Sequence, residues 1–334
     1  MFPDWLAGAI GATCKDTALT VGDHVYSPHN GVWVNDAMAV SAAQEQTSDT
    51  FGYKWQKKES FESPELLAHV KSWALKRYGD IGTLLREFSH RPVVLDAGCG
   101  AALTALELFG EHFSGIKYIG VDISDAVFVA RERVRARGFD GVFFKDDLVR
   151  LPFSPGGVDC ILSEGVLHHT DSTKGALASL APLIRPGGYF IFYVYNKKGP
   201  IREFTDDYIR ERLQTMKPEE AWEALRPLTE LGIQLGRIDA ELDFPDGLPI
   251  LDVPPGKISL QRFFYWHIFK AFYNPAMAFD EMLHINFDWY APKNAFRQTP
   301  EEVRQWCAEL AFDICRMDVE PAGITVVARK NCGA

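Results

Sequence analysis

The sequence lacks paired cysteines and long apolar runs, and each absence removes a class of protein. Its six cysteines are scattered, and no two form a C-x-x-C pair. This argues against a zinc ribbon or a disulfide framework and favours a reducing, cytoplasmic location. No apolar stretch approaches the ~20 residues that cross a bilayer. The first residues contain an acid, Asp4, and no Lys or Arg, so we expect no signal peptide.

Positive charge is also scarce. The chain has 334 residues, with 35 Lys and Arg against 45 Asp and Glu, and a formal net charge of −10. Nucleic-acid binding needs basic clusters that release counterions, so we expect no nucleic-acid partner. An anionic membrane surface would repel the chain as well. The length suits one large domain or two modest ones with a sizeable core.

Short apolar runs alternate with helical stretches through the middle of the chain. Expected strands are 93–96, 118–122, 141–144, 158–162 and 189–195, and expected helices are 101–109, 124–137 and 174–183. A helix beginning at Thr299 and strands at 314–319 and 324–328 complete the pattern. Such alternation predicts an α/β fold with a seven-stranded, doubly wound, Rossmann-like sheet.

The residues that precede the first strand of this pattern differ from it. Residues 1–60 are rich in turn-forming residues, and 25–26 and 32–34 could be strands joined by a Ser-Pro-His-Asn-Gly turn. A helix should begin at Ser63, which is followed by Pro, and continue toward Phe88.

A glycine-rich turn follows the first strand of the sheet. Gly98 and Gly100 allow the backbone to turn tightly and to approach a ligand. The next strand ends in Asp122, a carboxylate placed to accept hydrogen bonds from a ribose diol. The dinucleotide fingerprint would need glycine where Leu103 stands, and Asp96 would repel a pyrophosphate but suit an ammonium group. A turn with no ligand remains the alternative at this point.

Four motifs, in order and spacing, resemble those of class I S-adenosylmethionine-dependent methyltransferases of the type-11 kind. They are residues 95–100 (LDAGCG), 147–153 (DLVRLPF), 158–169 (VDCILSEGVLHH) and 183–190 (LIRPGGYF). Many relatives have a third glycine where this chain has Ala102. The resemblance implies the cofactor S-adenosyl-L-methionine and the fold predicted above.

The resemblance also implies cofactor contacts. Gly98 and Gly100 would lie beside the methionine part, with Asp96 near its ammonium. Asp122 would hold the ribose. The remaining implied contacts are Ile123 packing on adenine, Asp147 and Leu148 at the adenine edge with Asp146 as the alternative register, and Ser163 and Glu164 beside the reactive methyl.

Residues 50–55 (TFGYKW) resemble an aromatic motif that folds over the cofactor in a subset of the family, which would place Tyr53 at the cofactor. The alternative is that Tyr53 and Trp55 anchor the head to the core. The head resembles a small zinc-ribbon-like lead domain, but Cys14 stands alone, so we expect no zinc and no other metal.

Residues 198–297 form an insertion after the fifth strand, near the edge where open α/β sheets bind ligands. We expect a mainly helical cap that builds the acceptor pocket. Expected substrate contacts are Tyr265, His267, Tyr273, His284, Trp289 and Tyr290. Core packing of these aromatics, or use of the surface in a homodimer, remains open.

The sequence therefore predicts methyl transfer to a small-molecule acceptor by in-line displacement. Candidates for a base are His169, His267 and Tyr193, although the histidine of this loop is usually structural in the family. The expected domains are a head at 1–60, a cofactor domain at 61–197 and 298–334, and a cap at 198–297. The acceptor atom, whether O, N, S or C, is not resolved.

Two alternatives remain open. One is transfer of a carboxymethyl or aminopropyl group from the same sulfonium, for which Arg150 and Arg202 are the nearest carboxylate-binding candidates. The other is a non-catalytic subunit that binds S-adenosylmethionine.

Overall fold

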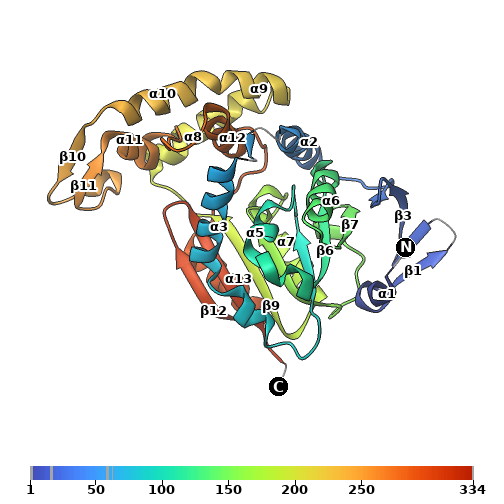
Figure 1. The fold of residues 1–334 in the computed structure, drawn as a ribbon. Coiled ribbons are helices and arrows are strands. Elements are labelled where there is room, and N and C mark those ends of the chain that lie inside the picture. Colours follow the sequence, from blue (N-terminus) through green and yellow to red (C-terminus); the bar gives the residue numbers. More distant parts are fainter. Residues whose placement is uncertain (1–2, 16–17, 58–59, 62, 333–334) are drawn as a thin grey trace.

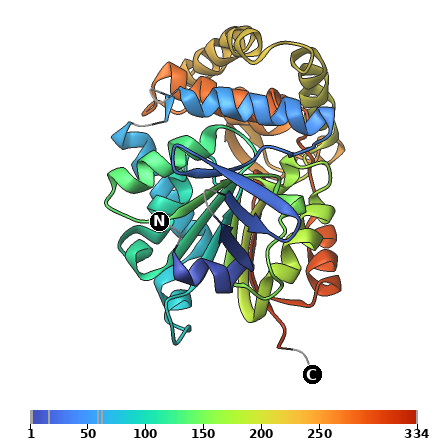
Figure 2. The same ribbon diagram turned by 90° about the vertical axis from the view of Figure 1, so that its right-hand side faces the viewer.

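The computed structural model of the chain describes residues 3–15, 18–57, 60–61 and 63–332. They form a large sheet with helices on both faces (Figure 1, Figure 2). Its eleven strands lie in the order β1-β2-β3-β4-β7-β6-β5-β8-β9-β13-β12. The strands are β1 (Ala12–Lys15), β2 (Ala18–Val21), β3 (His24–His29), β4 (Val32–Asn35), β5 (Val93–Ala97), β6 (Lys117–Asp122), β7 (Val142–Lys145), β8 (Val158–Glu164), β9 (Ile184–Tyr195), β12 (Phe312–Val319) and β13 (Gly323–Lys330).

The half of the sheet from β7 to β12 is the doubly wound, Rossmann-like sheet that the sequence predicts. Strands β7, β6, β5, β8 and β9 are parallel, and β13 and β12 join them antiparallel. Apolar clusters bury helices on both faces. One face carries α1 (Asp4–Ile10), α7 (Thr173–Leu180) and α13 (Pro300–Glu309), and the other carries α3 (Pro64–Tyr78), α4 (Ile81–Leu85), α5 (Leu103–Phe109) and α6 (Ala126–Ala136). The predicted fold class is confirmed.

The period of two along the strands explains why both faces are covered. In β5, Val93 and Leu95 pack into the cluster on one face, and Val94 packs into the cluster on the other. A strand that is apolar on both sides must lie between two layers of helices. Polar side chains are therefore confined to strand ends, and Asp96 and Asp122 lie at the carboxyl ends of β5 and β6.

The head extends the sheet to eleven strands, where the sequence analysis expected seven and a separate unit. The predicted hairpin is present as β3 and β4, and β4 pairs parallel with β7 through Trp33 and Phe144. An open edge at β7 would expose unpaired backbone groups, and this pairing covers it. The boundary at residue 60 therefore does not separate the head from the sheet.

Two helices connect the head with the sheet. Helix α2 (Ala42–Gln56) begins after Ser41, whose hydroxyl caps it. Helix α3 begins after Ser63 as predicted, but it ends at Tyr78 rather than continuing toward Phe88. The helix stops at Gly79, whose φ of 73° and ψ of −155° lie outside the helical region in a conformation that favours glycine.

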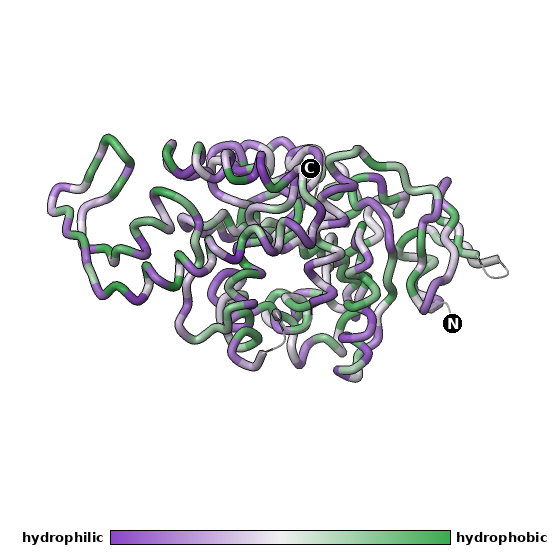
Figure 3. The backbone as a smooth tube through the Cα atoms, turned by 90° about the horizontal axis from the view of Figure 1, so that it is seen from above, coloured by the Kyte–Doolittle hydropathy of each residue, from purple (hydrophilic) through white to green (hydrophobic). Residues whose placement is uncertain are grey.

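Residues 198–297 contain most of the chain outside the sheet layers. The elements are α8 (Pro200–Leu213), α9 (Pro218–Ala224), α10 (Arg226–Arg237), the ribbon β10 (Glu241–Phe244) and β11 (Gly256–Ser259), α11 (Leu260–Phe263), a π-helical turn (Phe264–Ile268) and α12 (Phe279–Tyr290). The helices lie above the carboxyl edge of the sheet together with α2, and the ribbon projects at the end opposite the N-terminus (Figure 1, Figure 3). Among the described residues, no helix is both long and apolar enough to cross a membrane.

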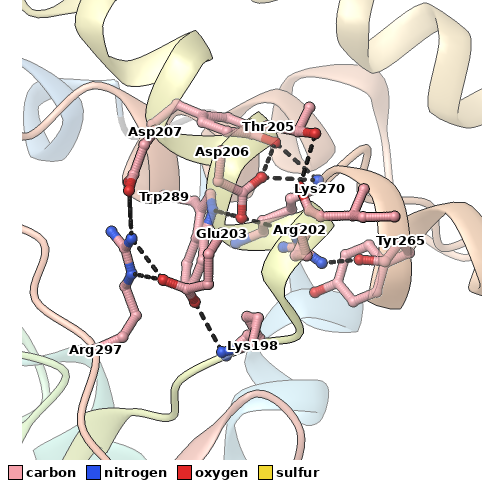
Figure 4. Close-up of polar contacts among 12 residues, drawn as sticks. Lys198, Arg202, Glu203, Thr205, Asp206, Asp207, Tyr265, Lys270, Trp289 and Arg297 are labelled. Atoms are coloured by element: carbon pink, nitrogen blue, oxygen red, sulfur yellow. Dashed lines mark hydrogen bonds and ion pairs between the residues drawn. The ribbon is translucent and has the colours of Figure 1, made fainter. Parts of the chain in front are cut away.

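A buried carboxylate, Asp206, organises the insertion (Figure 4). Its oxygens accept hydrogen bonds from Arg202 Nε at 2.6 Å, from Trp289 Nε1 at 2.8 Å and from the Tyr290 hydroxyl at 2.7 Å. The Lys270 main-chain N–H lies 3.3 Å from the same carboxylate. Arg202 and Asp206 belong to α8, Trp289 and Tyr290 belong to α12, and Lys270 precedes α12. The shared carboxylate therefore joins these three parts of the insertion.

We expect Asp206→Asn to destabilise the protein by about 3–5 kcal/mol, because it leaves Arg202 as a buried cation without its counter-charge. Thermal unfolding of the variant measures this. The matched control is Asp207→Asn, whose half-exposed carboxylate pairs with Arg297 at 2.8 Å and should cost about 0–1 kcal/mol. Equal losses in the two variants would contradict the special role of Asp206.

Candidate functional site

A cavity of about 390 Å³ opens at the carboxyl ends of β5, β6, β8 and β9. Helices α2 and α3 and the insertion also contribute to its wall. The described residues that line it include Gln44, Thr47, Phe51, Lys54, Trp55, His69, Trp73, Arg77, Asp96, Gly98, Gly100, Leu103, Asp122, Ile123, Asp147, Leu148, Glu164, His169, Tyr193, Tyr195, Lys270, Phe272, Ile285 and Asp288. Segments distant in sequence therefore meet around one space.

The glycine-rich turn forms one side of the cavity. Gly98 and Gly100 have φ angles of 84° and 50°, a region that side chains disfavour. A Cβ on Gly98 would collide with Val166, and one on Gly100 would lie 3.0 Å from Trp55 Nε1. The turn is therefore close-packed beneath the α2 helix and exposes backbone to the cavity.

Two carboxylates at the ends of β5 and β6 face this turn. Asp122 accepts hydrogen bonds from the N–H groups of Gly100 at 2.8 Å and Ser124 at 2.9 Å, which fix its orientation. Asp96 accepts one from the Tyr118 hydroxyl at 2.6 Å. Burial raises the pKa of Asp122 and raises that of Asp96 to about 7. Neither carboxylate has an ion pair among the described residues, so a cationic or hydroxyl-bearing ligand would favour their ionised forms.

The structure distinguishes the two adjacent acids after β7. Asp146 is buried and accepts hydrogen bonds from Tyr26 Oη at 2.5 Å and Asn35 Nδ2 at 2.9 Å. It therefore fastens the head to the sheet. Asp147 lines the cavity and accepts the Val149 N–H at 3.1 Å. Asp147 is thus the acid available to a ligand.

The other end of the cavity, beyond β8 and β9, contains a buried arginine. The Arg77 guanidinium lies between the rings of Trp73, 3.7 Å from its centroid, and Tyr193, 3.9 Å from its centroid. Glu164, at the end of β8, lies 3.6 Å from Arg77 Nη1 and accepts a hydrogen bond from the Tyr78 hydroxyl. Burial raises the pKa of Glu164 to about 8.

His169 also lines the cavity, and its two ring nitrogens differ. Nδ1 lies 2.6 Å from the main-chain oxygen of Asn294, so Nδ1 carries the proton and donates it. Nε2 is buried and has no partner among the described residues. Burial lowers the pKa of His169 to about 4, so the imidazole is neutral at neutral pH. Nε2 is therefore a free acceptor.

A second ion pair covers the cavity from α2. The Lys54 ammonium lies 2.5 Å from Asp288 of α12, and Asp288 also accepts the Tyr195 hydroxyl at 3.0 Å. Burial alone would raise the pKa of Asp288, but the Lys54 charge outweighs it and holds the pKa well below its usual range. This pair joins α2 to the insertion across the cavity.

Ten of the residues named from the sequence line the cavity: Asp96, Gly98, Gly100, Asp122, Ile123, Asp147, Leu148, Glu164, His169 and Tyr193. Ser163 does not, because it is fully buried and donates to the Ala97 carbonyl at 2.9 Å. Tyr53 lies on α2 but packs against Trp222 and Phe287 of the insertion. Its surroundings correspond to the anchoring alternative.

The six aromatics and histidines expected to contact the acceptor are absent from the described cavity wall. Trp289 and Tyr290 donate to Asp206, and the Tyr265 carbonyl accepts from Arg202 (Figure 4). His267 lies beside Phe263, with ring centroids 5.5 Å apart. The remaining two, His284 and Tyr273, contact Ser60 and Gly236 respectively. These residues pack within the insertion or, in the case of His284, join it to residues 55 and 60–61, and none lines the described cavity.

Sequence reasoning missed most of the wall that covers the cavity. From α2 and α3 it missed Thr47, Phe51, Lys54, Trp73 and Arg77, and from the insertion it missed Lys270, Phe272, Ile285 and Asp288. Thr47, Phe51 and Lys54 follow helical spacing and mark one face of α2. That spacing was the available signal.

The comparisons with known proteins agree on one domain. A family described as a methyltransferase domain matches residues 95–192. An uncharacterised protein of Synechococcus sp. is 32% identical over 115 residues, which are 33% of this chain and 27% of that protein. An uncharacterised methyltransferase of Mycobacterium tuberculosis is 34% identical over 96 residues, which are 28% of this chain and 46% of that protein. The chain thus spans less than half the length of these curated relatives.

Solved structures with low sequence identity are also similar. A magnesium protoporphyrin IX methyltransferase of Synechocystis with bound SAM is 14% identical, with a TM-score of 0.46 over 88% of this chain and 99% of that chain. A 1,6-didemethyltoxoflavin-N1-methyltransferase of Burkholderia thailandensis is also 14% identical, with a TM-score of 0.45 over 96% of this chain and 99% of that chain.

The matched residues 95–192 contain the glycine-rich turn and the carboxylates described above. The comparisons therefore identify residues 95–192 as a methyltransferase domain.

Proposed function

We propose that this protein transfers a methyl group from S-adenosylmethionine to a small-molecule acceptor inside the covered cavity. The observation that carries the proposal is the continuity of the cavity. One wall joins the glycine-rich turn and the carboxylates of the methyltransferase domain to a compartment beyond β8 and β9. A cofactor at the first end would present its methyl toward the second.

The residues at the first end fit the cofactor chemically. Asp96 would face the ammonium of the methionine part, which would favour the ionised form of this carboxyl group. Asp122 Oδ1 already accepts the N–H and the hydroxyl of Ser124, and Oδ2 accepts the Gly100 N–H, so Oδ2 keeps one lone pair for a ribose hydroxyl. Asp147 and Leu148 would address the adenine edge. These contacts include no basic residue, so they do not favour a phosphate-bearing ligand.

S-adenosylmethionine, when bound, supplies an electrophilic methyl on a sulfonium. The protein's part is to hold the acceptor in line with that methyl and to exclude water. Of the three candidate bases, His169 fits best, because its unpartnered Nε2 can take a proton from an O–H or N–H acceptor. Burial raises the pKa of Tyr193, so its phenol stays protonated, and His267 lies outside the cavity wall.

The alternative reaction, transfer of a carboxymethyl or aminopropyl group from the sulfonium, has less support from the structure. Arg150, a candidate for binding a transferred carboxylate, lies 4.0 Å from Asp147 and is largely exposed. Arg202, the other candidate, is bound to Asp206. A non-catalytic subunit that binds S-adenosylmethionine would need the cofactor end of the cavity but not the second compartment beside it.

The first prediction from the proposed function concerns the cofactor. We expect S-adenosylhomocysteine to bind and to stabilise the protein by about 2.7 kcal/mol at 100 times its dissociation constant, because it binds the folded state alone. Thermal unfolding with and without the nucleoside measures this. Tight binding of NAD without binding of S-adenosylhomocysteine would contradict the proposal.

The second prediction concerns Asp122. We expect Asp122→Ala to weaken S-adenosylhomocysteine binding by about 1.5–3 kcal/mol, the usual value of hydrogen bonds to a charged group. Titration calorimetry measures it. The control is Asp125→Ala in the same loop, whose exposed carboxylate pairs with Lys145 at 2.7 Å and should leave the affinity unchanged. Equal affinities of the Asp122 variant and wild type would show that the ribose binds elsewhere.

The third prediction concerns His169. We expect His169→Asn to lower turnover of an O–H or N–H acceptor about 100-fold, the low end for general base catalysis, because a base with a pKa of about 4 is weak. Release of S-adenosylhomocysteine from a panel of phenols, amines and thiols measures this. Cofactor affinity should stay near the wild-type value. The control is His29→Asn, at the exposed end of β3. Wild-type turnover by the His169 variant would contradict the role of His169 as the base.

A further inference from the structure

The acceptor end of the cavity contains a buried cation with unused hydrogen-bond donors. Arg77 is 4% exposed and lines the cavity from α3. Its Nε and Nη1 atoms are buried and find no acceptor among the described residues. A guanidinium has five N–H donors in a planar fork, so two buried nitrogens without partners need an explanation.

The acids near Arg77 do not supply that explanation. Glu164 and Glu320 lie 3.6 and 3.7 Å from guanidinium nitrogens, beyond hydrogen-bond distance. Glu164 accepts a hydrogen bond from the Tyr78 hydroxyl, and burial raises the pKa of its carboxyl group to about 8 against the opposing effect of the Arg77 charge. Glu320 is partly exposed and accepts Lys76 at 2.8 Å. Arg77 therefore has two acids at ion-pair distance, but its Nε and Nη1 donors remain without a hydrogen-bond acceptor among the described residues.

A buried lysine, Lys270, lines the same cavity from the insertion. Burial lowers the pKa of its ammonium group to about 7, and a bound anion would favour the charged form. It is 7% exposed, and its main-chain N–H is fixed by the Tyr290 hydroxyl at 2.8 Å. Its ammonium lies 4.9 Å from the Trp289 ring centroid, and no described carboxylate lies within ion-pair distance. The nearby Asp288 is already bonded to Lys54.

The position of Arg77 separates it from the cofactor contacts. Its neighbours Glu164 and Tyr193 end β8 and β9, and Glu320 precedes β13. The carboxylates assigned to the cofactor follow β5, β6 and β7, on the other side of the sheet order. An anion held by Arg77 would thus lie in the acceptor compartment.

We propose that the acceptor is a small carboxylic acid whose carboxylate is bound by Arg77 and Lys270. The inference rests on the proposed function, since it names the substrate class of that site. A planar carboxylate matches the fork of Arg77. Trp73, Tyr193, Phe272 and Ile285, which also line the cavity, supply apolar and aromatic surface for the body of the acid.

The test uses protein saturated with S-adenosylhomocysteine and two pairs of probes of equal shape. The pairs are benzoate with benzamide, and hexanoate with hexanamide. We expect at least one acid to bind about tenfold or more tightly than its amide, because charge-assisted hydrogen bonds discriminate by at least that factor. Calorimetry and thermal shift measure the affinities. Equal binding of acid and amide in both pairs would overturn the proposal.

Variants locate the effect. Arg77→Met and, independently, Lys270→Met should each abolish most of the preference for the acid, and Arg77→Lys should retain part of it. Melting without ligand checks that each variant folds, and Lys270→Met remains informative if Arg77→Met does not fold. A preference that survives in every folded Met variant would contradict the assignment.

The cofactor is the other source of a carboxylate. If Arg77 binds the acceptor, the affinity for S-adenosylhomocysteine should stay within about twofold of wild type in Arg77→Met. A loss of tenfold or more would place the cofactor's own carboxylate at Arg77 and overturn the proposal. Arg77-dependent preference for carboxylated S-adenosylmethionine over S-adenosylmethionine would overturn it as well. Failure of wild type to bind S-adenosylhomocysteine would instead defeat the proposed function itself.

Discussion

Burial of both faces of the parallel sheet is the constraint on which the rest of the structure depends. Because helices cover each face, a polar side chain on a central strand can reach a ligand only at the strand's carboxyl end. Asp96, Asp122 and Glu164 occupy that edge on β5, β6 and β8. Parallel strands end together, so residues far apart in sequence converge there. The α2 helix and the insertion then close the edge from above.

Buried or partly buried carboxylates hold the added segments in place around this sheet. Asp146 binds the head through Tyr26, Asp288 binds α2 through Lys54, and Asp206 joins the helices of the insertion. A buried carboxylate is costly without partners, so each specifies one arrangement of the segments around it. The covering of the cavity is thus fixed by directional contacts as well as by apolar packing.

The sequence was sufficient where a period or a turn determines the local structure. Alternation along β5 and β6, the Ser63 cap and the glycines at 98 and 100 each have a local cause, so the sheet and the cofactor end could be predicted. The insertion was different, because its aromatics satisfy helical spacing on more than one face. Trp289 and Tyr290 turn inward and donate to Asp206, whereas the nearby Lys270 and Asp288 line the cavity, and helical spacing does not distinguish the two pairs. The left-handed Ala102, with φ 56°, likewise depends on tertiary context.

Under the proposed assignments, acidic and basic side chains lie in different parts of the cavity. Asp96, Asp122 and Asp147 lie at the carboxyl ends of β5, β6 and β7, which are assigned to the cofactor. Arg77 lies beside Glu164 and Tyr193 at the ends of β8 and β9, and Lys270 lines the same cavity from the insertion. In a cavity sheltered from water such charges interact more strongly than at the surface. An acid entering the cofactor end would meet like charge, as would an ammonium at the acceptor end. The same charges that bind each molecule would therefore disfavour an exchange of their positions. An in-line transfer requires this fixed arrangement of cofactor and acceptor.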